Sequence, residues 1–502
     1  MILTKKQLFT DASSKDNLAN KAVNNGIITI IEQMIRLILQ VSSTSILARY
    51  ITPDSYGLIS MVAVVTNFVA IFKDVGLSII TIQKEHITES ESSNLFWINV
   101  ALSTALGVLV ALFSPIVSWF YGRSELIGIT IYMGIALAIS GISMQHQALL
   151  KRNLRFDSIF VINIASYFIS LVVMVVMAIY GYEYTTLVVG TLVQNILITL
   201  ITFFCCRWIP QKYDKHTKIG SMVKFGINVT TFEFVNYFTR NLDNILIGKY
   251  CGSEQLGLYS KAYQIVYMPI NRIRAPINNV ALPIMAKVST DSQRLRRYFK
   301  IQTMILSIIV IPLMMGIFSN ARDSILLLFG ENWLQMEFVF KVLSFVAIFQ
   351  PVFSASGTVF MALGRADLHL SAGIYTSACT VISFIIGVNY GVNGVAVAYA
   401  CSSIITQFIS FAILFKNSAI KLYDLVEGVL PTTVSAIIAC VLCTLIKKHI
   451  VISGLFFRFI FSFSTLYIIF ICLMLVIPTG RAQLLYIINL ILSKFKLSKK
   501  NQ

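Results

Sequence analysis

Long apolar stretches alternate with short polar connectors along almost the whole chain. A helix that crosses a lipid bilayer needs about 20 mainly apolar residues. On this basis the pattern predicts about fourteen membrane-spanning helices and no inserted soluble domain. Their expected positions are 24–48, 56–81, 94–119, 126–149, 158–180, 184–205, 221–248, 257–285, 299–318, 337–363, 367–389, 392–415, 425–446 and 455–478.

One polar connector occurs twice, 200 residues apart. The stretch ARYITPDSYGLIS begins at Ala48 and GKYCGSEQLGLYS begins at Gly248, and both carry the same Tyr, Gly, Leu and Ser at matching positions. An even number of predicted helices separates the two copies, so both copies face the same side of the membrane. Such a parallel repeat relates two halves by an axis along the membrane normal. The repeat therefore predicts an all-α integral membrane protein with two six-helix lobes and two additional C-terminal helices.

The repeat also suggests how the chain divides. We expect two lobes that enclose a central cavity and expose it alternately by rocking. The expected parts are a polar N-terminal tail (1–23), a first lobe (24–206), a basic linker (207–220), a second lobe (221–416), and a C-terminal part with the last two helices and a basic tail (417–502).

Composition supports a membrane protein. Of the 502 residues, 57% are hydrophobic and 12% are charged, and the mean hydropathy is +0.78. Soluble domains carry about 25% charged residues. The formal net charge of +18 would suggest nucleic acid in a soluble protein, but here the basic residues lie in short connectors. Membrane topology explains them better, and we expect no nucleic-acid partner.

The basic connectors predict an orientation. Lysine and arginine gather in both tails and in alternate connectors, as at 151–155 and 294–300, so we expect both termini to be cytoplasmic. The N-terminal tail lacks the apolar core of a cleavable signal peptide. Two connectors fit this orientation poorly. KEHITESESSN (84–94) is an acidic inner connector, and Lys447–Lys448 form a basic outer one.

Catalytic and metal-binding motifs are missing from the sequence pattern. There is no nucleophile beside a base, no glycine-rich phosphate loop and no HExxH motif. The cysteines lie mostly in apolar runs, and the CVLC stretch at 440–443 has no partner ligands nearby. The pattern therefore predicts no enzyme, no cofactor and no metal site.

Polar residues interrupt the first two predicted helices of each lobe. Glu32, Arg36 and Gln40 recur at helical spacing and share one face. A guanidinium near mid-bilayer, such as that of Arg36, costs about 2.5–3.5 kcal/mol or more on insertion scales. Because lipid does not tolerate such stripes, we expect them to line the cavity. The other members are Asp74 in helix two, Glu233, Asn236, Arg240 and Asp243 in helix seven, and Asn271, Arg274 and Asn278 in helix eight.

Two interpretations of these charges stay open. Arginine keeps its charge when desolvated and binds phosphate oxygens with two parallel hydrogen bonds, so Arg36, Arg240 and Arg274 could form an anion site. Alternatively, Glu32 with Arg36 and Arg240 with Asp243 could be neutral pairs that hold helices together.

At these residues the chain resembles the bacterial polysaccharide flippases of the multidrug/oligosaccharidyl-lipid/polysaccharide exporter superfamily, especially colanic-acid and teichuronic-acid exporters. The resemblance covers residues 40–300 best. It rests on LARYITPDSYGLISMVAVV (47–65), KDVGLS (73–78), LFWINVAL (95–102), QHQALLKRNLRF (145–156) and NLDNILIGKYCGSEQLGLYSKAYQIVYMP (241–269).

The resemblance implies a fold like that of the MATE transporters, a place in the bacterial plasma membrane, and a function in capsule, O-antigen or exopolysaccharide synthesis. Such relatives flip undecaprenyl-pyrophosphate-linked oligosaccharides from the inner to the outer leaflet. The implied partners are this lipid-linked oligosaccharide, membrane lipid, and glycosyltransferases or a polymerase.

The polar stripes then receive expected roles. The pyrophosphate would meet Arg36, Arg240 and Arg274, and the sugars would meet Gln40, Asn236, Asn271 and Asn278. The acids Glu32, Glu233, Asp243 and Asp74 could carry a coupling proton or Na⁺.

Two other functions compete with a flippase. A drug or cation antiporter of the same superfamily would need unopposed carboxylates, whereas here arginines stand beside the acids. A polysaccharide polymerase or ligase would need a catalytic cluster or a sizeable outer loop, and the longest outer connector, near 319–336, offers neither.

Overall fold

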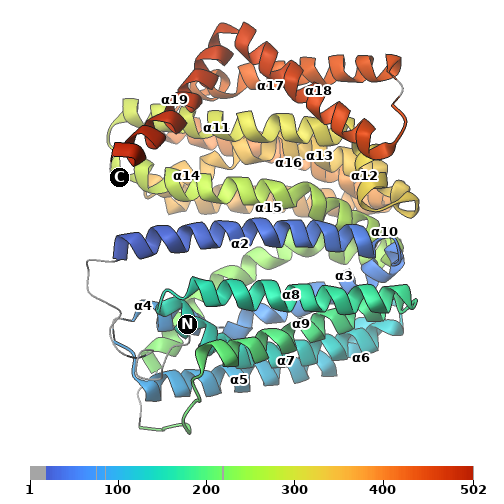
Figure 1. The fold of residues 1–502 in the computed structure, drawn as a ribbon, viewed down its shortest axis with the longest axis vertical. Coiled ribbons are helices and arrows are strands. Elements are labelled where there is room, and N and C mark those ends of the chain that lie inside the picture. Colours follow the sequence, from blue (N-terminus) through green and yellow to red (C-terminus); the bar gives the residue numbers. More distant parts are fainter. Residues whose placement is uncertain are drawn as a thin grey trace. The chain divides into compact units, whose positions relative to one another are not determined.

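The computed structural model describes residues 9, 18–74, 76–84, 86–216, 220–450 and 452–500. Side chains are described for residues 9, 25–73, 76–84, 86–216, 237, 241–450 and 452–489. Within these ranges every regular element is helical (Figure 1). The chain divides into two compact units, which we call the first unit (1–257) and the second unit (258–502).

In its described part, the first unit contains eight helices and the beginning of a ninth. They are α2 (Leu18–Leu47), α3 (Pro53–Asp74), α4 (Leu77–Gln83), α5 (Glu89–Leu112), α6 (Ser114–Tyr121), α7 (Glu125–Arg152), α8 (Phe156–Ile179), α9 (Glu183–Cys206) and the first part of α10 (Gly220–Lys287). Pro53 opens α3, where its missing N–H costs no helical hydrogen bond. Figure 1 shows α5, α7, α8 and α9 running alongside one another. Gly107 and Gly134 let α5 and α7 approach, because a Cβ at either glycine would contact the other's carbonyl oxygen at 2.5 Å.

The second unit contains the end of α10 and the remaining helices. They are α11 (Ser292–Ser319), α12 (Ala321–Leu328), η2 (Glu331–Met336), α13 (Glu337–Phe353), α14 (Ala355–Ala362), α15 (Ala366–Gly387), η3 (Val388–Tyr390), α16 (Gly391–Asn417), α17 (Leu422–His449), α18 (Leu455–Val476) and α19 (Pro478–Lys500). Its core includes Phe299, Val359, Phe360 and Leu414.

The predicted helices are present as helical structure, and the chain is a multi-pass membrane protein. In the described part, 11 helical stretches are long and apolar enough to span a membrane. One of them, Ala366–Asn417, covers two predicted helices, and α10 covers two more. The predicted count of fourteen is consistent with this arrangement and stays a prediction.

Two boundaries differ from the prediction. The connector expected at 249–256 is replaced by a kink inside α10, where Gly252 has φ 86° and ψ 174°. A side chain would strain this backbone conformation, which glycine adopts readily. A single glycine therefore changes the direction of the chain here, where the sequence predicted a connecting loop. In addition, α19 is helical where the sequence predicted only a basic tail.

The acidic connector has a structural explanation. Thr88 and Glu91 form a capping box at the start of α5, and Lys84 pairs with Glu91 at 2.5 Å. Acidic side chains are favourable at a helix N-terminus because the helix dipole is positive there. Glu89 and Glu91 therefore stand in the first turn of α5.

The two copies of the repeated connector meet inside the first unit. A Cβ at Gly57 would overlap the backbone carbonyl of Ser253, and a Cβ at Gly257 would overlap that of Pro53. The two contacts are related by the same 200-residue offset as the sequence repeat. Glycine at both positions lets α3 and α10 cross with their backbones in contact.

Ion pairs fasten this crossing. We use the name Arg123 cluster for Arg123, Asp54, Glu125 and Ser253. The Arg123 guanidinium donates to both Asp54 oxygens at 3.1 and 3.0 Å, to the Glu125 carboxylate at 3.1 and 3.3 Å, and to Ser253 Oγ at 2.8 Å. Hydrogen bonds to Asp54 and then to Glu125 raise the pKa of Arg123 above its usual value, so the guanidinium stays charged.

A comparable cluster lies in the second unit and explains Lys447, which the sequence placed in a basic outer connector and which lies in the last turn of α17. We use the name Asp323 cluster for Asp323, Asn320, Lys447 and Arg458. Arg458 donates to both Asp323 oxygens at 2.6 and 3.1 Å, and Lys447 Nζ lies 2.5 Å from Asn320 Oδ1 and 3.5 Å from Asp323. Lys447 is therefore held by polar groups of the neighbouring helices, and α12, α17 and α18 are cross-linked at this end.

The other end of α17 is fastened in the same way. Arg296 of α11 donates to both oxygens of the buried Asp424 at 2.8 and 2.9 Å. Between the two ends, Gly428 leaves room for Thr303, and Ser307 lies within hydrogen-bonding distance of Thr432. The first of the two C-terminal helices is thus packed along its length against α11.

Candidate functional site

The predicted polar face of helix one lies on α2 and contacts α8. Glu32 is buried, and its carboxylate accepts a hydrogen bond from Asn163 Nδ2 at 2.6 Å. Farther along α2, Ser43 hydrogen bonds to the Tyr167 hydroxyl, and Arg36 lies close enough to interact with it electrostatically. Arg36 itself is exposed. The structure therefore joins Glu32 to a neighbouring helix, while Arg36 keeps an accessible side chain.

Several predicted site residues have only their backbone in the described part. The side chains of Asp74, Glu233, Asn236 and Arg240 lie outside the described residues, so their roles stay predictions. Asp243 is described: its side chain is 5% exposed, and it accepts a hydrogen bond from the Asn244 backbone N–H at 2.8 Å. Gln40 is half-buried on α2.

The three predicted residues of helix eight lie in the second unit and separate into two environments. Arg274 Nη2 donates to Asn271 Oδ1 at 3.3 Å, and Asn271 is exposed. Asn278 instead accepts from Gln302 Nε2 at 2.9 Å, and Gln302 also reaches Thr358 at 3.3 Å. Asn278 thus takes part in a hydrogen-bond chain across α10, α11 and α14.

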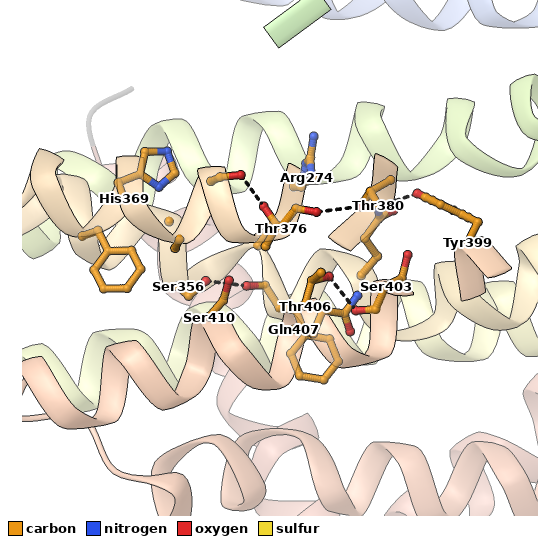
Figure 2. Close-up of a pocket in the computed structure, with 17 residues that line it drawn as sticks. Arg274, Ser356, His369, Thr376, Thr380, Tyr399, Ser403, Thr406, Gln407 and Ser410 are labelled. Carbon is orange, nitrogen blue, oxygen red and sulfur yellow. Dashed lines mark hydrogen bonds between the residues drawn. The ribbon is translucent and has the colours of Figure 1, made fainter. Parts of the chain in front are cut away.

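Arg274 also lines a cavity within the second unit, which we call the hydroxyl pocket (Figure 2). Its volume is about 350 Å³. Besides Arg274 it is lined by Gln350, Phe353, Ser354, Ser356, Gly357 and Phe360 of α13, α14 and their junction, by His369, Ala372, Gly373, Thr376 and Thr380 of α15, and by Tyr399, Ser403, Thr406, Gln407 and Ser410 of α16. Among the described residues, this lining contains no aspartate or glutamate.

Local sequence explains why these side chains meet. Thr376 and Thr380 are four residues apart on α15, and Ser403, Thr406 and Ser410 recur at intervals of three and four on α16. Such spacing places each set on one face of its helix. Figure 2 shows His369 and Tyr399 toward opposite ends of the pocket.

Only Arg274 of this pocket was predicted from the sequence, because the prediction selected helices that carry charged residues and passed over helices whose polar residues are serine and threonine. The signal was available: polar residues at helical spacing within two apolar stretches. Serine and threonine also occur singly in membrane helices, where they bond to their own backbone, so periodicity was the feature that distinguished these positions.

No metal centre is indicated within the described residues, since no group of three or more His, Cys, Asp or Glu side chains is placed to hold an ion. His146 illustrates a structural histidine. It is buried, and its Nε2 lies 3.0 Å from the Trp208 carbonyl oxygen, beside Phe96 and Phe203. It fastens the segment after α9 to α7.

Comparison with known proteins defines the class. Residues 46–338 match the family described as polysaccharide biosynthesis protein, which is more than half of the chain. The chain belongs to this family.

Two curated relatives and two solved structures are informative. The chain is 30% identical to the teichuronic acid biosynthesis protein TuaB of Bacillus subtilis (strain 168), over 68% of this chain and 71% of TuaB. It is 24% identical to the lipopolysaccharide biosynthesis protein WzxC of Escherichia coli (strain K12), over 80% of this chain and 82% of WzxC.

The fold is similar to that of the lipid II flippase MurJ in an inward closed conformation, with a TM-score of 0.70, 15% identity, and coverage of 90% of this chain and 98% of MurJ. It is also similar to an inward-facing MATE family transporter of the MOP superfamily, with a TM-score of 0.58, 12% identity, and coverage of 78% and 99%. The predicted all-α, MATE-like membrane fold is therefore confirmed.

Proposed function

We propose that this protein flips undecaprenyl-pyrophosphate-linked oligosaccharide repeat units from the inner to the outer leaflet, for the synthesis of a surface polysaccharide. Family membership supports the substrate class, and the MurJ-like fold is one that can translocate a lipid-linked molecule. The observation that carries the proposal is the hydroxyl pocket, which places an arginine and many neutral polar groups inside a membrane-spanning bundle.

The pocket favours this substrate over an organic cation. A cation inside a bilayer needs negative charge nearby, because desolvating it is costly. The described lining offers hydroxyls, amides and a guanidinium instead. These groups suit an oligosaccharide attached to an anion.

The proposed assignments follow the chemistry of each side chain. Arg36 and Arg274, with Arg240, would bind the pyrophosphate oxygens by charge-assisted hydrogen bonds. Glu32, buried beside Asn163, is proposed to carry a coupling proton or cation. Asp74, Glu233 and Asp243 remain further candidates for that role, as do Gln40, Asn236, Asn271 and Asn278 for sugar contacts.

Deleting the protein from its host tests this function. Lipid-linked repeat units should accumulate on the inner leaflet, and surface polysaccharide should disappear. Arg36→Ala, Arg240→Ala and Arg274→Ala should each reduce export at normal protein levels. Arg365→Ala is the matched control, because Arg365 is exposed and pairs with Asp367 between α14 and α15.

Two outcomes oppose different parts of the proposal. Unchanged surface polysaccharide and no lipid-linked intermediate after deletion would overturn the function. Normal export by Arg36→Ala and Arg240→Ala would overturn the arginine site while leaving the function standing.

A further inference from the structure

The hydroxyl pocket lies where a membrane helix is interrupted. The span containing α13 and α14 carries Pro351 within α13, and the two helices are separated at Ser354. Gln350, Phe353, Ser354 and Ser356, around this interruption, all line the pocket. Interrupted helices in membrane transporters mark places where backbone and side chains serve a ligand.

Five hydroxyls of the pocket already donate their protons to backbone carbonyl oxygens. Thr376 Oγ1 donates to the Gly373 carbonyl at 2.9 Å, Thr380 to Thr376 at 2.8 Å, and Thr406 to Ser403 at 3.1 Å. Ser354 and Ser356 donate to Pro351 and Phe353 in the same way. Each of these five oxygens therefore keeps only lone pairs for a ligand, and this favours a ligand with several hydrogen-bond donors.

Donors and aromatic faces complete the lining. The Gln407 side chain lines the pocket, and no hydrogen bond to its amide is found in the part of the chain that the structure describes. Gln350 Nε2 lies 3.4 Å from the Tyr399 hydroxyl. Phe353, Phe360 and Tyr399 add ring surfaces, whose negative faces attract the weakly positive C–H bonds of a saturated ring.

We propose that the hydroxyl pocket is a sugar-binding subsite that takes one pyranose ring of the lipid-linked oligosaccharide. The ring's hydroxyls donate to the threonine and serine oxygens, the glutamine amides donate to its oxygens, and its C–H face packs against an aromatic ring. The volume of about 350 Å³ lies within the range of about 300–1,000 Å³ that small-ligand pockets span. This inference rests on the proposed function and names the part of the substrate that the second unit recognises.

Burial supports a ligand rather than lipid contact. Ser356, Ser403 and Thr406 are 6%, 7% and 7% exposed, so they do not face hydrocarbon. An apolar lipid tail would leave the Gln407 amide and the remaining lone pairs of the lining oxygens without hydrogen-bond partners, which is costly in a bilayer. A sugar satisfies them.

Gly373 provides a way to fill the pocket without distorting the helix. It lines the cavity, and open space lies where its Cβ would stand, since nothing comes within 4 Å. Gly373→Leu should therefore fold and occupy the subsite. Gly128→Leu on α7 is the matched control, because nothing lies within 4 Å of its Cβ position and it does not line this pocket.

The test measures binding of two probes to the full-length protein in lipid nanodiscs. One probe is the lipid-linked repeat unit extracted from a strain that lacks the protein, and the other is undecaprenyl pyrophosphate alone. The wild-type protein should bind the repeat unit more tightly. Gln407→Leu should reduce that affinity about tenfold, as the loss of one or two ligand hydrogen bonds predicts, and leave undecaprenyl pyrophosphate binding unchanged.

Adjacent serines supply a second control. Ser403 lines the pocket, whereas Ser402 does not line it, is similarly buried at 4%, and donates to the Tyr399 backbone carbonyl. Ser403→Ala should weaken repeat-unit binding and Ser402→Ala should not. Gly373→Leu should abolish the preference for the repeat unit.

The outcomes separate the subsite from the proposed function. Equal binding of both probes to the wild type, or an unchanged preference in Gly373→Leu and Gln407→Leu, would overturn the subsite while export continued to support a flippase. The absence of any lipid-linked repeat unit in the deleted strain would overturn the proposed function itself, and with it the subsite.

Discussion

The Arg123 cluster and the hydroxyl pocket use polar side chains in opposite ways. In the cluster, the Arg123 guanidinium donates hydrogen bonds to two carboxylates and a serine hydroxyl from separate segments of the first unit. These polar groups are therefore paired with one another. In the pocket, most polar groups are neutral, and they surround about 350 Å³ of space. The Asp323 cluster of the second unit follows the first pattern. In these two clusters charge holds helix ends together, whereas the pocket that indicates a ligand has a mostly neutral polar lining with one arginine, Arg274.

The largest expected effect comes from the crossing beside the Arg123 cluster. Gly57→Ala would place a methyl group on the Ser253 carbonyl and force α3 and α10 apart. Overpacking of this kind costs about 1–3 kcal/mol and occasionally more. Thermal unfolding of the purified protein should show a lower melting temperature for Gly57→Ala and for Gly257→Ala.

Gly128→Ala is the control for that measurement, since its Cβ would meet nothing within 4 Å. Equal melting temperatures for Gly57→Ala and the wild type would show that the repeated connector is not a packing contact. The contrast between the Arg123 cluster and the hydroxyl pocket would then no longer hold, because the crossing beside the cluster would not stabilise the fold.

An intermediate effect is expected in the Asp323 cluster. Asp323→Asn keeps the shape of the side chain but removes the charge that Arg458 and Lys447 share. Because the Asp323 side chain is only 10% exposed while Arg458 is 42% exposed, we expect a loss of about 1–2 kcal/mol. A double-mutant cycle with Arg458→Gln should give a favourable coupling free energy, and additive effects would contradict the pairing.

The smallest effect is expected for an ion pair outside any cluster. Asp367 and Arg365 are 63% and 45% exposed, and the hydrogen bond to Asp367 raises the pKa of Arg365 above its usual value. Water and salt screen such a pair, so Asp367→Asn should leave the melting temperature unchanged within error. A shift as large as that of Asp323→Asn would remove the distinction between the charge clusters and an isolated surface pair.

The sequence was sufficient for the membrane fold because bilayer thickness fixes the length of an apolar helix. It was not sufficient for the kink at Gly252, since a glycine in a polar connector is equally compatible with a loop. It led to Asn278 as a sugar contact, which stays a prediction, but not to the hydrogen bond that Asn278 accepts from Gln302. An amide in a membrane helix can serve a ligand, a neighbouring helix or both, and the helical partner is visible only in the tertiary structure.

The site was predictable only where a charged side chain marked it. Arg274 was expected from its charge and does line a pocket. Its companions on α15 and α16 are uncharged, and their helical spacing is a weaker signal within strongly apolar stretches. Lys447 shows the converse, because a lysine that seemed to contradict the topology is held by Asn320 and Asp323.

Translocation in proteoliposomes tests the central claim most directly. The purified protein would be reconstituted with fluorescently labelled lipid-linked repeat units, and a membrane-impermeant quencher would report the outer-leaflet fraction over time. The account predicts exchange between leaflets with the wild type, strongly slowed exchange with Gly373→Leu, and wild-type exchange with Gly128→Leu. Exchange no faster than in protein-free liposomes would contradict it.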